Sequence, residues 1–253
     1  MTLRTAVLTL VLALGAAGCS DDEDASGSGS GQVIVSAAAS LKTAFTDYGK
    51  GFDGTIVRLS FAGSDELAAQ IRQGVKPDVF AAANTKLPDE LFREGLVEKP
   101  VVFATNALVL AVPKDGQIAS LEELGEDGVE LALGAEGVPV GDYTRKVLAR
   151  LDGDDGDRIL ANVRSNEPDV NGIVGKLTQG AADAGFVYRT DVLATDGRLR
   201  TIALPKALEP DVQYGVAVVK GAPNPEQARA FVDGLVDGAG AQALTRAGFG
   251  RAP

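Results

Sequence analysis

The sequence predicts an α/β protein of two lobes, each a mostly parallel sheet flanked by helices, with two crossing strands as the hinge. Three observations lead to this prediction. Short apolar strands alternate with amphipathic helical segments over Gln32–Glu98, which is typical of a helix-covered parallel sheet. Two longer apolar runs, Val101–Val112 and Val212–Val219, have the character of strands that pass between lobes. The segment between these runs again alternates strands with helices. The predicted lobes are therefore residues 32–105 plus 214–253, and residues 106–213.

The first 31 residues are expected to lie outside both lobes. Arg4 and the apolar run Ala6–Ala17 predict a secretory signal peptide over residues 1–18, because the run is shorter than a membrane-spanning helix needs. Residues 19–31 start with the only cysteine, Cys19, and continue as an acidic, Gly/Ser-rich tether. This start resembles a bacterial lipoprotein signal, which implies an exported protein anchored to the membrane through lipidated Cys19, at the cell surface or in the periplasm. An ordinary signal peptide with an incidental cysteine is the alternative.

Composition excludes several classes of function. The net charge of −11 argues against nucleic acid or an anionic membrane surface as a partner. The chain has no histidine, which removes histidine-dependent catalytic triads and histidine metal sites. With Cys19 assigned to the anchor, no cysteine nucleophile remains. We therefore predict no catalytic residue, no cofactor and no protein-bound metal.

The first predicted strand, Val33–Val35, is followed by the small residues Ser36–Ala39. The period then changes to that of a helix, because the apolar residues Leu41, Ala44, Phe45, Tyr48 and Phe52 share one face. Ser40 is expected to be the N-cap of this helix, where free N–H groups and the helix dipole favour an anion.

The pattern repeats twice more in the first lobe. Thr55–Phe61 is the second strand, and Ser64 is expected to cap the helix that follows it. Asp78–Ala83 is the third strand, and a helix opens at Asn84 or Thr85 with Leu87, Leu91 and Phe92 on its apolar face. At the end of the chain, Asn224, Pro225 and Gln227 form an N-cap and capping-box pattern for a helix with Ala228, Phe231, Val232, Leu235 and Val236 on its core face.

The second lobe has weaker signals. Strands are predicted at Leu131–Gly134, Ala184–Val187 and Leu199–Leu204. One helix is expected to begin near Val140 and another near Val170, after the start signals Pro168 and Asp169. Further predictions are a short helix at Leu121–Leu124, an acidic connection at Gly153–Asp157, an irregular lead-in at Asn162–Asp169 and a short terminal helix at Gln242–Ala247.

Four helix starts lie at the carboxyl ends of strands or after small-residue turns: Ser40, Ser64, Val140 and Val170. Ligands of doubly wound α/β domains bind at this edge of the sheet. Facing lobes would bring these hydroxyl and backbone N–H donors together around a small oxyanion, with no Lys or Arg in the immediate motifs. Taken singly, each serine is an ordinary cap, each valine a turn or core residue, and Tyr188 a half-buried aromatic.

With those residues in view, the chain resembles the periplasmic molybdate-binding proteins, the receptors of molybdate ABC importers. The segments that carry the resemblance are AAASL at 37–41, FAGSDELAAQI at 61–71, PDVFAAAN at 77–84, GVPVGDY at 137–143, NEPDVNGIVGKLTQGAADAGFVY at 166–188 and YGVAVVKGAPNPEQARAFVDGL at 214–235. The resemblance implies a type II periplasmic-binding-protein fold. Where the family often has aspartate this chain has Asn84, and it has Gly63 and Asp65 where a second serine or threonine is common; we expect Asp65 to point away from the anion.

The resemblance also implies roles for five residues. Ser40 and Ser64 would bind the oxyanion through hydroxyl and N–H, Val140 and Val170 through backbone N–H alone, and Tyr188 through its phenol. The expected function is capture of molybdate or tungstate for an ABC permease, by a monomer. Donors without an acceptor suit a fully ionised dianion, whereas protonated phosphate needs an acceptor. The alternatives are another ligand, such as sulfate, phosphonate or ferric iron, and an enzyme on the same fold.

Overall fold

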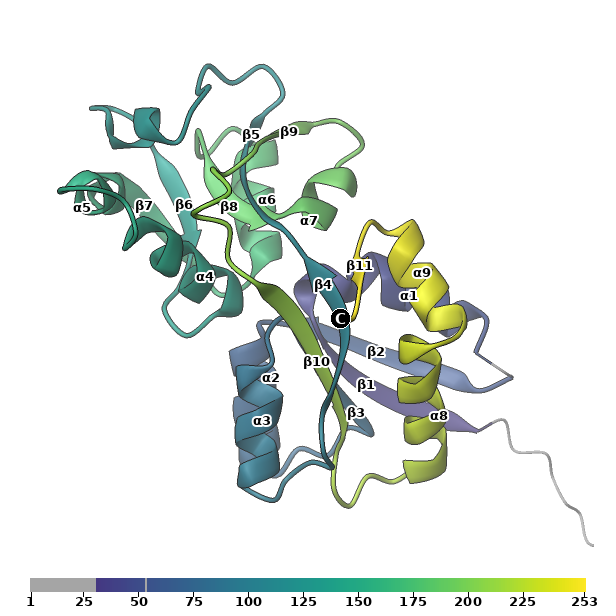
Figure 1. Ribbon diagram of the computed structural model, residues 1–253. Helices are drawn as coiled ribbons and strands as arrows, with labels where there is room; N and C mark the ends of the chain where they lie inside the picture. The colour runs from purple at the N-terminus through teal and green to yellow at the C-terminus, as the bar shows by residue number, and fades with distance from the viewer. Residues whose placement is uncertain (1–30, 53) are drawn as a thin grey trace, which may run out of the picture.

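The computed structural model describes residues 31–52 and 54–253. The predicted signal peptide (1–18), Cys19 and the tether up to residue 30 lie outside the described residues. Within them the chain forms two α/β lobes joined by the crossing strands β4 (Val101–Asn106) and β10 (Val212–Val218) (Figure 1). No helix in the described part of the chain is long and apolar enough to cross a membrane.

The first lobe is built on a six-stranded sheet with the order β11-β4-β10-β3-β1-β2. Strand β1 lies between β2 and β3 and is parallel to both, as the repeating strand–helix pattern predicts. Strand β10 pairs antiparallel with β3 and β4, so the sheet is mixed because the crossing strand returns in the opposite direction. The strands are β1 Gln32–Ala38, β2 Ile56–Ala62, β3 Val79–Ala82, β4 Val101–Asn106, β10 Val212–Val218 and β11 Gly250–Arg251.

Helices cover both faces of this sheet (Figure 1). In strand β3, Val79 and Ala81 belong to one core cluster and Phe80 and Ala82 to another, because successive side chains point to opposite faces. A strand buried on both faces reads as a continuous apolar run, which is why no polar alternation marks it in the sequence. The covering helices are α1 Lys42–Lys50, α8 Pro225–Val236 and α9 Ala239–Arg246 on one side, and α2 Ser64–Arg72 and α3 Lys86–Arg93 on the other.

The second lobe holds a three-stranded sheet, β8-β5-β9, and a parallel pair, β6-β7. The three-stranded sheet is not mostly parallel as predicted, because the crossing strand β5 pairs antiparallel with both β8 and β9. A parallel bridge between Leu131 and Ala184 joins the two groups of strands. The strands are β5 Leu108–Pro113, β6 Leu131–Gly134, β7 Val163–Glu167, β8 Gly185–Tyr188 and β9 Leu199–Ile202. The helices are the 3-10 turn η2 Glu122–Gly125, α4 Pro139–Leu148, α5 Asp155–Ala161, α6 Val170–Thr178 and α7 Arg189–Leu193.

The first crossing strand changes sheets over three residues. Asn106 ends β4 in the first sheet, and Leu108 begins β5 in the second. On the return path, Val212 pairs with Asn106, so both crossings lie side by side between the lobes. The exact lobe bounds stay a prediction.

Several local predictions were wrong. Strand β7 was missed because its sequence, VRSNE, is polar and its residues are exposed or half-buried. The connection predicted at Gly153–Asp157 contains the start of α5, where acidic residues favour the first turn. Two residues predicted on core faces, Phe92 and Val236, are 41% and 48% exposed.

Helix α8 starts at Pro225 as predicted, but Asn224 does not cap it with its side chain. Its amide instead donates to Asp78 Oδ2 over 3.1 Å, and its backbone N–H donates to Asp78 Oδ1 over 2.7 Å. The backbone N–H of Ile34 also donates to Asp78 Oδ2 over 2.7 Å. Asp78 is fully buried, so these hydrogen bonds satisfy a carboxylate that would otherwise destabilise the core.

Candidate functional site

A small cavity lies between the lobes, and all five predicted binding residues line it. The first lobe contributes the ends of β1, β2 and β3, and the second lobe contributes the starts of α4 and α6 and the end of β8. The full lining is Ala38, Ala39, Ser40, Ala62, Gly63, Ser64, Ala83, Val138, Pro139, Val140, Asp169, Val170 and Tyr188.

The size of the cavity restricts its occupant. It offers about 20 Å³ to the centres of water-sized atoms. This equals a sphere of about 1.7 Å radius, which is the scale of one small inorganic anion.

Helix starts supply the backbone donors. Ser64 and Val170 are the first residues of α2 and α6, Val140 is the second residue of α4, and Ser40 lies in the 3-10 turn Ala39–Leu41 that precedes α1. N–H groups in the first turn of a helix have no carbonyl partner within that helix. Together with the helix dipoles, they make the cavity attractive to an anion without any cationic side chain.

The serines are not N-caps, contrary to the sequence prediction, because their hydroxyls make tertiary contacts instead. Ser64 Oγ accepts a hydrogen bond from the backbone N–H of Ala83, the residue after β3, over 3.1 Å. Since an N–H can only donate, the hydrogen of the Ser64 hydroxyl remains available to a ligand. Ser40 Oγ lies 2.9 Å from the hydroxyl of Tyr214 on β10.

Tyr188 ends β8 with its ring buried and 1% exposed. Its hydroxyl makes no hydrogen bond to another residue in the described part of the chain. Burial, followed by the neighbouring Tyr214, raises the pKa of the phenol well above its ordinary value, so the group stays protonated and neutral. A buried hydroxyl without a protein partner that lines a cavity is placed to bind a ligand.

The charges near the cavity are few. Asp169 is the one carboxylate among the lining residues, and its Oδ1 accepts from the backbone N–H of Gly172 as the N-cap of α6. Asp65, expected to point away, is not in the lining, although its Oδ1 is buried without a hydrogen-bond partner among the described residues. Asn84 is also absent from the lining, and its Oδ1 accepts from Leu87 N–H at the start of α3.

The sequence interpretation missed Tyr214 and Ala83, whose atoms hold the two serine hydroxyls. Neither has a local signal, because Tyr214 lies 174 residues after Ser40 in an apolar strand and Ala83 acts through its backbone. No group of three or more His, Cys, Asp or Glu that could hold a metal ion occurs in the part of the chain that the structure describes.

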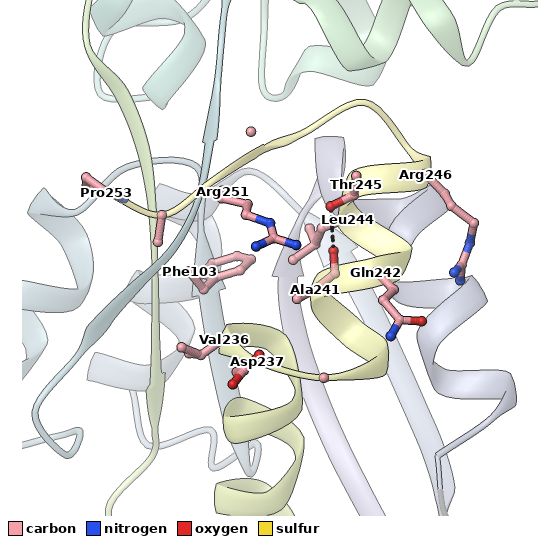
Figure 2. Close-up of a pocket in the computed structure, with 13 residues that line it drawn as sticks. Phe103, Val236, Asp237, Ala241, Gln242, Leu244, Thr245, Arg246, Arg251 and Pro253 are labelled. Atoms are coloured by element: carbon pink, nitrogen blue, oxygen red, sulfur yellow. Dashed lines mark hydrogen bonds between the residues drawn. The ribbon is translucent and has the colours of Figure 1, made fainter.

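A much larger groove of about 800 Å³ lies elsewhere, beside β4, α9 and the C-terminal residues (Figure 2). Its positively charged lining residues are Arg246 and Arg251. Arg246 also forms an ion pair with Asp47 over 2.5 Å. We call this feature the C-terminal groove. It lacks the converging helix starts of the interlobe cavity, so size alone does not make it the binding site.

The family model described as "Bacterial extracellular solute-binding protein" matches residues 33–250. The molybdate-binding protein ModA of Mycobacterium tuberculosis is 35% identical over 226 residues, which cover 87% of this chain and 84% of that protein. The periplasmic molybdate-binding protein of Azotobacter vinelandii has a similar fold, with a TM-score of 0.78 and 19% identity over 87% of this chain and all of that one. The sulfate-binding protein SubI of M. tuberculosis also has a TM-score of 0.78, with 16% identity over 87% of this chain and 86% of that chain.

Proposed function

The chain belongs to the family of bacterial extracellular solute-binding proteins, and on that premise we propose that it captures molybdate, and tungstate with it, in the interlobe cavity. The observation that carries the proposal is the convergence of uncharged donors from both lobes on a space the size of one small anion. The 35% identity to a protein named for molybdate binding favours this ligand over other oxyanions.

The five proposed ligand residues act in two ways. Ser40 and Ser64 donate hydroxyl and N–H hydrogens and Tyr188 its phenol hydrogen, whereas Val140 and Val170 donate only backbone N–H. Seven such bonds, each worth about 1.5–3 kcal/mol to an anion, support micromolar or tighter affinity after the cost of ordering. Local donors thus offset the distant, screened field of a protein with net charge −11.

We propose that the site binds and does not catalyse. The serine hydroxyls contact Tyr214 and the N–H of Ala83, and neither partner is a general base. Without an activating base a serine is a poor nucleophile. Sulfate remains the alternative ligand, because it is also a tetrahedral dianion and a sulfate-binding protein has a similar fold.

We further propose delivery to an ABC permease by a monomer tethered through lipidated Cys19. The lobes 32–105 plus 214–253 and 106–213 would close on the anion about the crossing strands. Replacing Cys19 by Ser should release the protein from the membrane fraction. Retention of that variant in the membrane would contradict the anchor.

Calorimetric titration with molybdate, tungstate, sulfate and phosphate tests the ligand. Ser40→Ala and Ser64→Ala should each weaken molybdate binding about tenfold or more, because each removes about 1.5 kcal/mol of anion bonding. Val140→Ala is the matched control, since only its backbone N–H is used and affinity should change little. Unchanged affinity in both serine variants would contradict the proposed site.

A further inference from the structure

A row of hydrogen-bonded polar side chains, buried except for the half-buried Asn106, connects the crossing strands to Ser40. Tyr214 on β10 is fully buried, and its hydroxyl has two hydrogen-bond partners among the described residues: Ser40 Oγ at 2.9 Å and Asn106 Nδ2 at 3.4 Å. Asn106 is the last residue of β4, so both crossing strands, β4 and β10 (Figure 1), contribute to this row of side chains. Neither Tyr214 nor Asn106 lines the cavity.

The orientation of the Asn106 amide is fixed by its other contacts. Its Oδ1 accepts a hydrogen bond over 2.9 Å from the backbone N–H of Ala107, and a backbone N–H can only donate. Its Nδ2 therefore faces the opposite way, where it donates to Thr190 Oγ1 over 2.9 Å and lies beside the Tyr214 hydroxyl. A flipped amide would place two donors against each other at Ala107.

This orientation decides the direction of the next hydrogen bond. The Tyr214 hydrogen cannot go to Asn106 Nδ2, because an amide NH₂ group does not accept. The remaining partner is Ser40 Oγ, which can accept this hydrogen. Buried hydroxyl hydrogens in folded proteins nearly always have an acceptor. Tyr214 thus donates to Ser40, and the Ser40 hydrogen is left to point to the cavity.

We propose that Tyr214, held by Asn106, is a positioning residue that makes Ser40 an obligatory donor to the bound oxyanion and so excludes protonated oxyanions. The inference rests on the proposed function. An oxyanion that carries a proton needs an acceptor in its site. Tyr214 takes up one of the two lone pairs of Ser40 Oγ, and the Ser40 hydroxyl then turns its hydrogen, and not its other lone pair, to the anion. Ser64 is in the same condition, because its oxygen accepts one hydrogen bond from the N–H of Ala83 and its own hydrogen is left to face the anion. A fully ionised dianion needs only donors and fits both serines.

Titration of four proteins tests the inference: wild type, Tyr214→Phe, Ser40→Ala and the double variant. Each is measured with molybdate and with phosphate above its second pKa, so that both anions carry two charges and only phosphate carries a proton. Tyr214→Phe should weaken molybdate binding about three- to tenfold and lower the molybdate-to-phosphate preference. In the Ser40→Ala background, Tyr214→Phe should change molybdate affinity less than about twofold, because it acts through the serine.

Two further variants separate this role from a structural one. Tyr48→Phe removes another buried tyrosine hydroxyl in the first lobe, one that donates to the Phe231 carbonyl over 3.2 Å, and should leave the anion preference unchanged. Asn106→Asp replaces the amide by a carboxylate that accepts the Tyr214 hydrogen, so Ser40 turns its own hydrogen to Tyr214. That variant should lower the molybdate-to-phosphate preference further, and it keeps the proposal testable if Tyr214→Phe fails to fold.

The outcomes separate the inference from the proposed function. A wild type that binds neither anion overturns the proposed function and the inference with it. If wild type binds molybdate, two results would overturn the inference alone. The first is that the affinity losses of Tyr214→Phe and Ser40→Ala multiply in the double variant. The second is that Tyr214→Phe leaves the molybdate-to-phosphate preference unchanged.

Discussion

Replacing Tyr188 by Phe should affect ligand binding and protein stability very differently. The hydroxyl makes no hydrogen bond to another described residue, so its removal costs the free protein no internal bond. In the complex it would donate to a dianion, and such a bond is worth about 1.5–3 kcal/mol. At about 1.4 kcal/mol for each tenfold change, molybdate affinity should fall about 10- to 150-fold. The free energy of unfolding without ligand should change by less than about 1 kcal/mol.

Calorimetry measures the affinity, and urea unfolding of the ligand-free protein measures stability. The matched control is Tyr48→Phe, which breaks a bond to the Phe231 carbonyl. Tyr48→Phe should show the opposite effects to Tyr188→Phe. Its free energy of unfolding should be lower by about 1 kcal/mol, and its molybdate affinity should be unchanged. If Tyr188→Phe bound molybdate as tightly as wild type, the phenol would not be a ligand and the reasoning from its missing partner would fail.

Three other perturbations test separate parts of the account. Gly63→Ala would place a Cβ 2.5 Å from the carbonyl oxygen of Pro168, across the lobes, and 2.8 Å from Asp65 Oδ1, at the end of a side chain that can turn away. Molybdate affinity should therefore fall at least about fivefold while the free energy of unfolding of the ligand-free protein changes little; equal affinity would exclude the Pro168 contact from closure. Burial raises the pKa of Asp191 to about 7, so the folded state holds the proton more tightly and stability falls as pH rises from about 4 to about 7. Asp191→Asn keeps an acceptor for Tyr188 N–H and should lose that fall of about 1.4 kcal/mol per pH unit in urea unfolding. A pH profile of stability parallel to that of wild type would contradict this. Raising the salt concentration should not weaken molybdate binding in calorimetry, because the lining has no cation to screen; a steep loss would indicate a Lys or Arg clamp.

Much of the fold was predictable because β3 is buried on both faces, β2 alternates along its length and the helices carry clear apolar stripes. The predicted two-lobed α/β fold is confirmed, and β1, β2 and β3 are parallel as the strand–helix repeat requires. Strand β7 was not predicted, because a short polar strand has neither an apolar run nor a strong alternation.

The candidate site could be predicted only as a set of helix starts. Their convergence depends on how two lobes face each other, which local periodicity does not report. The hydrogen-bond partners of the serine hydroxyls could not be predicted from the sequence. Ser40 contacts Tyr214, which lies 174 residues away in the chain, and Ser64 accepts from a backbone N–H, which no residue type marks. Tyr188 could be named only through resemblance, because nothing in its neighbours indicates that its hydroxyl would be buried without a partner.

Diffraction from a crystal grown with tungstate tests the central claim most directly, because the heavy atom marks the bound anion. We predict one strong anomalous peak in the interlobe cavity, within hydrogen-bond reach of the hydroxyls of Ser40, Ser64 and Tyr188, with no Lys or Arg in contact. A peak in the C-terminal groove beside Arg246 and Arg251, with the interlobe cavity empty, would contradict the account.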